Sequence, residues 1–128
     1  MAKVLIVDDE PMTTEMLAAF LRILGHESAD AFNCRHAWDK LTSYTPDVIL
    51  LDIMLPDQNG IEMCRDLRAR PETRTVPVIM ISAIAPAKTE EAAAAGANGY
   101  LGKPISIASL KNALAQIGIE SGSSARIK

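Results

Sequence analysis

The chain has 128 residues, 48% of them hydrophobic, and this length suits one compact domain with a single core. Its 13 basic and 16 acidic residues give a net charge of −3, and no basic cluster is present, so we expect no direct binding to nucleic acid. No apolar stretch approaches the roughly 20 residues of a membrane-spanning helix, and no signal pattern opens the sequence. We therefore expect a cytoplasmic protein that does not contact a membrane.

Short runs rich in Val, Ile and Leu alternate along the chain with longer segments of helical character. This alternation predicts an α/β fold in which helices cover both faces of a parallel sheet. The predicted strands are residues 3–7, 27–31, 48–52, 78–82 and 98–101. The predicted helices are residues 11–24, a helix capped by Asn33 that ends before Pro46, residues 60–69, an alanine-rich helix that closes at Gly96, and residues 107–117. We assign residues 1–118 to one domain and residues 119–128 to a C-terminal tail or linker.

The two cysteines, Cys34 and Cys64, lie far apart in the sequence and form no CxxC pattern. Disulfides and zinc sites usually show closer or repeated cysteine spacing. We therefore predict two reduced, buried thiols of the kind common in cytosolic domains.

Polar side chains stand at the ends of several predicted strands. Asp8 and Asp9 follow the first strand, Asp52 ends the third, Ser82 ends the fourth, and Lys103 follows the fifth. Ligands of open parallel sheets bind beyond the carboxyl ends of the strands, where the strand order reverses. The sequence therefore predicts that these side chains meet at one edge of the sheet and form a site there.

The residue types at this edge indicate phosphoryl chemistry. Three carboxylates held close together repel one another unless a cation holds them. Carboxylate oxygens suit Mg²⁺, which commonly takes one or two carboxylates together with waters and a phosphate oxygen. Lys103 adds a positive donor and Ser82 a hydroxyl, which are groups that stabilise a phosphoryl group during transfer. Asp52 can then act as a nucleophile that forms an acyl phosphate.

Four segments give the chain a resemblance to the response-regulator receiver family of two-component signal transduction. They are VLIVDDEP, PDVILLDIMLPDQNGIE, PVIMIS and AGANGYLGKPIS, and they span about residues 2–117. The resemblance implies a CheY-like, flavodoxin-like fold: a doubly wound, five-stranded parallel sheet with strand order 2-1-3-4-5 and five helices.

A receiver is a phosphoprotein of a phosphorelay, and the resemblance implies that this chain is a signalling domain and not an enzyme. It would receive a phosphoryl group from a sensor histidine kinase or a histidine phosphotransfer protein. Its Mg²⁺-dependent chemistry would be limited to its own phosphorylation and dephosphorylation. A phosphorylation-driven change of conformation would then reach an output protein through the face formed by the fourth and fifth strand–helix units.

The resemblance also implies a separate role for each acidic residue of the site. Asp52 would be the phosphoacceptor. Asp9, Asp52 and the backbone carbonyl of Met54 would bind Mg²⁺ directly, and Asp8 would act on the ion largely through water.

The remaining site residues would bind the phosphoryl group or respond to it. Lys103 would pair with the phosphoryl oxygens, and Ser82 would donate a hydrogen bond to the group once it is attached. Tyr100 would be the aromatic switch that swings inward as Ser82 moves. The bond between Lys103 and Pro104 is a candidate cis peptide.

Two features depart from the commonest pattern of the family. The segment between Ser82 and Lys103 is short, so we expect a fourth helix that is reduced or starts late. Met54 and Ile84 are apolar at loop positions that influence the access of water to the acyl phosphate. We therefore expect slower self-dephosphorylation than in relatives that carry polar residues there.

Two other functions remain open at this level. One is a phosphorylation-independent docking module built on the same fold. The other is an aspartyl-nucleophile phosphohydrolase, although such enzymes place a second acid where this chain has Met54, and they carry insertions for which this chain has no room. A dinucleotide-binding fold is not indicated, because no GxGxxG motif follows the first strand.

Overall fold

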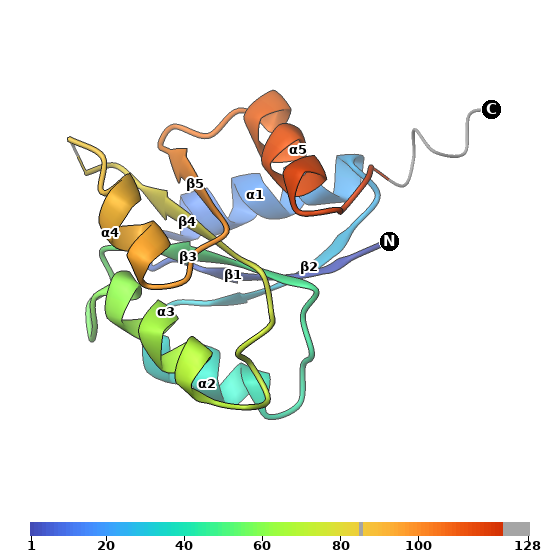
Figure 1. The fold of residues 1–128 in the computed structure, drawn as a ribbon. Helices are drawn as coiled ribbons and strands as arrows, with labels where there is room; N and C mark the ends of the chain where they lie inside the picture. Colours follow the sequence, from blue (N-terminus) through green and yellow to red (C-terminus); the bar gives the residue numbers. More distant parts are fainter. Residues whose placement is uncertain (85, 122–128) are drawn as a thin grey trace.

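The centre of the molecule is a parallel sheet of five strands in the order β2-β1-β3-β4-β5 (Figure 1). The computed structural model describes residues 1–84 and 86–121. The strands are β1 (Lys3–Val7), β2 (Glu27–Ala31), β3 (Val48–Asp52), β4 (Val78–Ser82) and β5 (Gly99–Gly102). The helices are α1 (Pro11–Ile23), α2 (Cys34–Leu41), α3 (Gly60–Ala69), α4 (Thr89–Ala94) and α5 (Ile107–Gln116). The predicted doubly wound fold and its strand order are confirmed.

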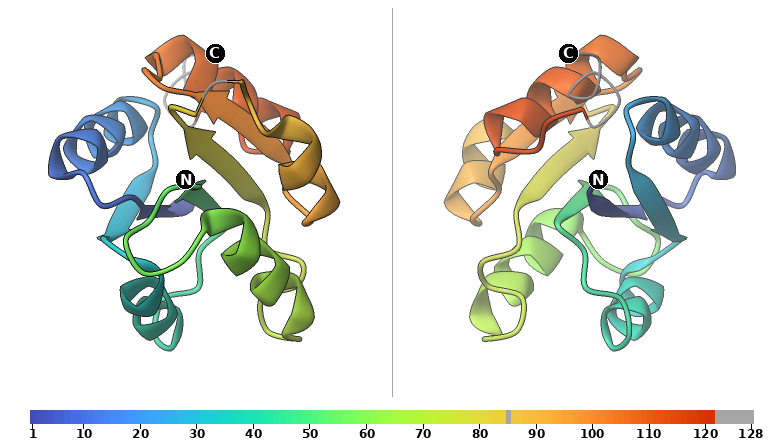
Figure 2. Two further views of the ribbon diagram at one scale, coloured as in Figure 1. Left: turned by 90° about the vertical axis from the view of Figure 1, so that its left-hand side faces the viewer. Right: turned by 90° about the vertical axis from the view of Figure 1, so that its right-hand side faces the viewer.

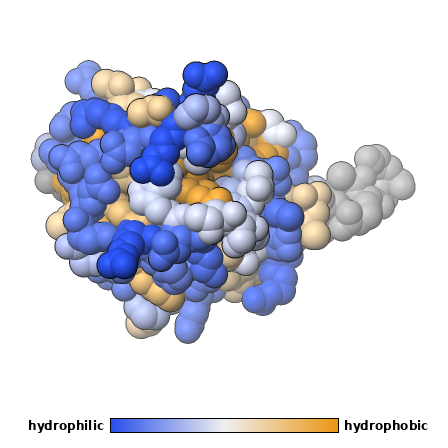
Figure 3. Space-filling model, turned by 90° about the horizontal axis from the view of Figure 1, so that it is seen from below, coloured by the Kyte–Doolittle hydropathy of each residue, from blue (hydrophilic) through white to orange (hydrophobic). Residues whose placement is uncertain are grey.

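Two layers of helices cover the sheet, one on each face (Figures 1 and 2). One core cluster joins the sheet to α1 and α5 through Leu17, Leu21, Leu110 and Leu114. The other cluster joins the opposite face to α2, α3 and α4, and Met63 is among its fully buried members. Burying a side chain of this size stabilises the fold by roughly 1.5–3 kcal/mol, so the two clusters fix the sheet between the layers. Viewed from below, on the side of α2 and α3, the surface is mostly hydrophilic around a small apolar area (Figure 3).

Most element boundaries agree with the prediction, and the differences are small. β5 starts and ends one residue later than predicted, α1 ends at Ile23, and α5 ends at Gln116. The fourth helix has only six residues, as the short segment before Lys103 suggested. Past α5, Ile119 still packs against the core cluster of α1 and α5, so packing continues into the predicted tail, whose residues 122–128 lie outside the described residues.

Both cysteines are free and buried, as predicted. Burial and the nearby carboxylate of Asp57 raise the pKa of the Cys34 thiol to about 12. Burial also raises the pKa of the Cys64 thiol. Both side chains are therefore neutral packing groups at neutral pH. Among the described residues, no helix combines the length and the apolar character that crossing a bilayer requires.

Arg68 on α3 joins two loops, between α3 and β4 and between α4 and β5, at the end of the sheet that lies opposite the carboxyl edge. Its guanidinium donates to the backbone oxygen of Gly96 from Nε at 3.1 Å and from Nη2 at 2.9 Å. It also donates to the backbone oxygen of Val76 at 2.7 Å and to Oδ1 of Asn98 at 2.9 Å. A planar guanidinium can serve these acceptors at once, whereas an ammonium cannot.

We expect Arg68→Lys to lower the free energy of unfolding by about 1–3 kcal/mol, because several carbonyl groups lose a charged donor. Urea unfolding followed by circular dichroism measures the change. Arg65→Lys on the exposed face of α3 is the matched control and should have little effect. Equal stability of the two variants would contradict this role of Arg68.

His26 is buried where α1 returns to the sheet. Its Nδ1 accepts the N–H of Ala2 at 3.0 Å, and its Nε2 has no hydrogen-bond partner among the described residues. Burial lowers the pKa of His26, the N-terminal ammonium group lowers it further, and Asp47 opposes the change. At neutral pH the imidazole of His26 is therefore uncharged in the folded protein.

This burial predicts a loss of stability in mild acid. The unfolded chain protonates His26 at about pH 6.5, and the folded protein does so only at lower pH. Between these two values the unfolded state binds more protons, so the free energy of unfolding falls as the pH falls. His26→Gln keeps an acceptor for Ala2 and should flatten this dependence in urea titrations between about pH 7.5 and pH 5.5. A variant with an unchanged pH dependence would exclude His26 as its source.

Candidate functional site

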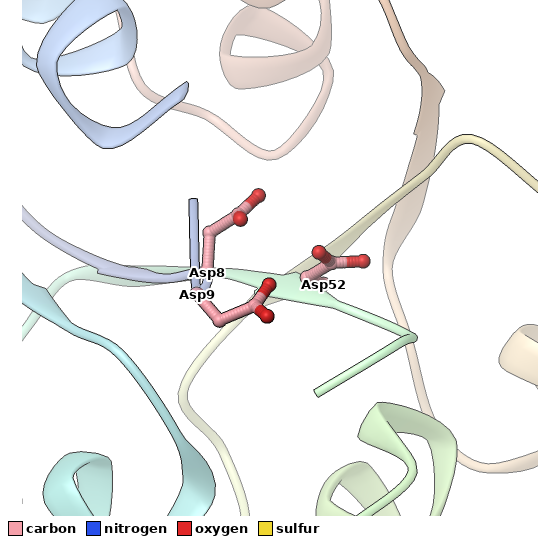
Figure 4. Close-up of side chains that lie close together, drawn as sticks. All are labelled: Asp8, Asp9 and Asp52. Atoms are coloured by element: carbon pink, nitrogen blue, oxygen red, sulfur yellow. The ribbon is translucent and has the colours of Figure 1, made fainter. Parts of the chain in front are cut away.

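The carboxyl ends of β1 and β3 bring three aspartates together (Figure 4). β1 pairs with β3, so Asp8 and Asp9, which follow β1, lie beside Asp52 at the end of β3. One carboxylate oxygen from each residue lies within 4.8 Å of the others. Asp8 and Asp52 are buried, and Asp9 is exposed. The three aspartates therefore meet at one edge of the sheet, as predicted.

Lys103 supplies the positive charge of this edge. β5 lies next to β4 and delivers Lys103 to the same end of the sheet, where the backbone N–H of Lys103 donates to the carbonyl of Ser82 at 2.8 Å. Its Nζ lies 2.8 Å from Oδ2 of Asp8 and 3.1 Å from Oδ2 of Asp52. One ammonium thus holds two buried carboxylates that would otherwise face each other unpaired.

These contacts set the protonation of the site. Burial raises the pKa of Asp52, and the charge of Asp8 adds to the effect, against hydrogen bonds from the Met54 N–H and from Lys103. Burial acts to lower the pKa of Lys103, but its hydrogen bonds to Asp8, Glu10 and Asp52 outweigh burial and raise it. Lys103 is therefore protonated at neutral pH, and its positive charge acts to lower the pKa of Asp52.

A cavity of about 240 Å³ opens above these groups. Its lining residues are Asp9, Glu10, Asp52, Met54, Ala83 and Lys103. The lining of the cavity therefore includes carboxylates and an ammonium group. Such a donor set fits Mg²⁺, because this ion prefers carboxylate and carbonyl oxygens and keeps room for water and for a phosphate oxygen.

Ser82 and Tyr100 are not among the residues that line this cavity. The buried Ser82 hydroxyl oxygen accepts the N–H of Ile84 at 2.9 Å, so it is engaged with its own loop. The Tyr100 hydroxyl accepts the N–H of Lys88 at 3.1 Å, just before α4 begins. The Lys103–Pro104 peptide bond is cis.

The two apolar loop residues occupy different places. Met54 is 64% exposed and lines the cavity, and its backbone N–H donates to Oδ1 of Asp52 at 3.1 Å. Ile84 packs against the core cluster of α2, α3 and α4, and the cavity wall at this point is Ala83.

Reasoning from the sequence missed two residues. Glu10, which the sequence did not single out, lies with Oε1 3.1 Å from Nζ of Lys103, and this pairing lowers the pKa of Glu10. Asp57 reaches from the loop after β3 to the start of α2. The position of Glu10 next to the aspartate pair was a usable signal, whereas nothing in the sequence near Asp57 points to α2.

Comparison with known proteins gives a consistent result. The family model for the response regulator receiver domain matches residues 4–115. The phosphate regulon transcriptional regulatory protein PhoB of Pseudomonas aeruginosa is 39% identical over 124 residues, a match that covers 90% of this chain and 52% of PhoB. PhoB of Rhizobium meliloti is 38% identical over 109 residues, with 81% of this chain and 46% of that protein covered. The chain thus spans about half of the length of these relatives.

Solved structures agree with the family match. The chemotaxis protein CheY4 of Vibrio cholerae has a TM-score of 0.84 and 32% identity, covering 91% of this chain and 98% of that chain. The receiver domain of a sensor histidine kinase of Pseudomonas aeruginosa, solved with a magnesium ion in its active-site cleft, has a TM-score of 0.81 and 32% identity, with the same coverage of 91% and 98%. The fold, the acidic edge and these matches agree, and the chain belongs to the response regulator receiver domain family.

Proposed function

We propose that this chain accepts a phosphoryl group on Asp52 and passes on a signal through a change of conformation. The observation that carries the proposal is the position of Nζ of Lys103, which lies 3.1 Å from Asp52 and 2.8 Å from Asp8, in the lining of a cavity that also contains carboxylates. The contact with Lys103 favours the ionised form of a buried carboxylate and places a fixed cation beside it. A nucleophilic carboxylate requires the first property, and the stabilisation of phosphoryl charge requires the second.

Asp52 performs the covalent step. An oxygen of its carboxylate forms a bond to phosphorus while the bond from phosphorus to the donor atom breaks, and the electron pair of that bond leaves with the donor. With a phosphohistidine donor, the leaving nitrogen takes up a proton and the imidazole is released neutral. Lys103 then pairs with the phosphoryl oxygens in place of the carboxylate oxygen that it holds at rest. Transfer of this kind depends on positioning and charge stabilisation.

Mg²⁺ is the cofactor of this proposal. Asp9, Asp52 and the backbone carbonyl of Met54 would bind the ion directly, and Asp8 would act on it largely through water. Bound there, Mg²⁺ would offset the negative charge that the phosphoryl group brings to an already acidic cavity.

Ser82 and Tyr100 form the proposed switch. Attachment of a phosphoryl group offers the Ser82 hydroxyl a charged acceptor, which is a stronger partner than a neutral one. Movement of Ser82 toward that acceptor would free space beside β4, and Tyr100 would turn inward and give up its contact with Lys88. Phosphorylation would in this way shift a pre-existing equilibrium at the start of α4.

The proposed partners follow from this chemistry. A sensor histidine kinase or a histidine phosphotransfer protein would supply the phosphoryl group, and an output protein would bind the face formed by α4, β5 and α5. The proposed receiver unit covers residues 1–118. Its proposed activity consists of its own phosphorylation and dephosphorylation, without turnover of a separate substrate.

The first test is phosphorylation by a small phosphodonor. We expect intact-mass measurement after incubation with acetyl phosphate and Mg²⁺ to show the gain of one phosphoryl group. Removal of Mg²⁺ with EDTA, or the substitution Asp52→Asn, should abolish the gain, because the first removes the charge compensation and the second removes the nucleophile. Asp66→Asn, which neutralises a carboxylate on the exposed face of α3, is the matched control and should be phosphorylated normally. A wild-type protein that gains no phosphoryl group with any donor would instead favour the docking-module function.

A second test concerns the lifetime of the acyl phosphate. Met54 presents an apolar side chain to the cavity, so no polar group at this position holds an attacking water. We expect the double variant Met54→Asn, Ile84→Glu to lose its phosphoryl group at least about threefold faster, which corresponds to about 0.7 kcal/mol in the barrier. Intact mass followed over time after removal of the donor measures the rate.

The exposed Met12 provides the control for this test, because Met12→Asn makes the same exchange outside the cavity. It should leave the lifetime unchanged. A double variant that loses phosphate no faster than wild type would exclude control of water access by Met54 and Ile84. The single variant Met54→Asn then shows how much of any effect comes from the residue in the cavity wall.

A further inference from the structure

The loop between β3 and α3 contains Met54, and it is held at both of its ends. The backbone N–H of Gly60 donates to the carbonyl of Ile53 at 2.7 Å, and Met54 and Asn59 form an antiparallel bridge. A Cβ at Gly60 would collide with the backbone oxygen of Asp52, so only glycine permits this closure. The loop is therefore closed at its base, and its outer part projects from the sheet.

The outer part of the loop has a separate anchor in Asp57. Its Oδ1 accepts the N–H of Cys34 at 2.9 Å, and its Oδ2 accepts the N–H of Arg35 at 3.0 Å. The Cys34 thiol adds a weak contact to the backbone oxygen of Gln58 at 3.8 Å. Both carboxylate oxygens of one exposed side chain thus bind the first turn of α2, which is distant in the sequence.

The first turn of α2 depends on this carboxylate. The N-cap residue Asn33 accepts the N–H of His36 at 2.7 Å, and Asp57 serves the N–H groups of Cys34 and Arg35 that have no acceptor within the helix. Burial acts to raise the pKa of Asp57, but these backbone N–H groups outweigh it and lower the pKa. A charged carboxylate at this end also interacts favourably with the helix dipole.

We propose that Asp57 is a positioning residue for the metal site, because its hydrogen bonds to α2 hold the loop that carries Met54, whose backbone carbonyl is a proposed ligand of Mg²⁺. Asp57 touches neither the metal ligands nor the reacting atoms, so it acts only through the loop. Residues that orient a metal ligand in this way typically change metal affinity by 10–100-fold when they are replaced. The inference rests on the proposed function of the site, and it adds α2 to the elements that determine metal affinity.

The test is Mg²⁺ binding without any phosphodonor, measured by isothermal titration calorimetry. We expect Asp57→Ala to weaken binding about tenfold, and Asp57→Asn, which keeps one acceptor, to weaken it less. Asp39→Asn removes a charge from the same groove on α2 without touching the loop anchor and is the matched control, with an affinity close to wild type. A folded Asp57→Ala protein that binds Mg²⁺ as tightly as wild type would overturn the inference.

A second readout separates positioning from a loss of stability. If the loop couples Mg²⁺ to α2, binding of Mg²⁺ to the wild-type protein must slow hydrogen exchange at the amides of Cys34 and Arg35. Unchanged exchange at both amides in the Mg²⁺-bound wild-type protein would also overturn the inference. At saturating Mg²⁺, Asp57→Ala should be phosphorylated at the wild-type rate, with only its Mg²⁺ dependence shifted. If wild type binds Mg²⁺ but gains no phosphoryl group, the proposed function fails while the role of Asp57 in metal binding is still decided by the titrations.

Discussion

The pairing of Lys103 with Asp8 and Asp52 is the interaction on which the rest of the site depends. Two carboxylates buried at the end of an apolar sheet repel each other and lose most of their hydration. The ammonium of Lys103 lies within 3.1 Å of both, so it offsets this cost at a point where three strands end. Burial raises the pKa of Asp52, and the same contact with Lys103 acts to lower it. Stability and reactivity at this edge therefore rest on one cation.

The sheet explains why these residues meet. β1 lies between β2 and β3, and β4 separates β3 from β5, so the residues that follow β1, β3 and β5 arrive at one edge from distant parts of the sequence. The helices contribute by packing and capping: the two core clusters hold the sheet, and loop contacts such as that of Asp57 with α2 set the backbone around the cavity. A change far from the carboxylates can thus alter the site through the loops.

The sequence predicted those parts of the molecule that depend on local patterns. β3 and β4 are buried at every residue, which makes them continuous apolar runs with clear ends, and their terminal residues Asp52 and Ser82 mark the edge. β5 begins and ends with glycine and carries little pattern, so its predicted bounds were displaced by one residue. The contacts of Glu10, Asp57 and Arg68 join residues far apart in the chain, and only the folded backbone determines which acceptors and donors they meet.

The negative charge around the cavity connects metal binding and phosphorylation with the proposed change of conformation. Asp8, Glu10 and Asp52 pair with the ammonium of Lys103, and Asp9 lies close to Asp8 and Asp52, so these residues together carry an excess of negative charge that favours a divalent cation. Under the proposed mechanism, phosphorylation replaces one carboxylate charge with a phosphoryl group that carries more, and the added charge needs new donors. Under the same mechanism the Ser82 hydroxyl, whose present contact is with the loop before α4, would turn toward this charge. Compensation of charge at Asp52 would then move that loop, and a local covalent step would in this way reach the surface of the domain.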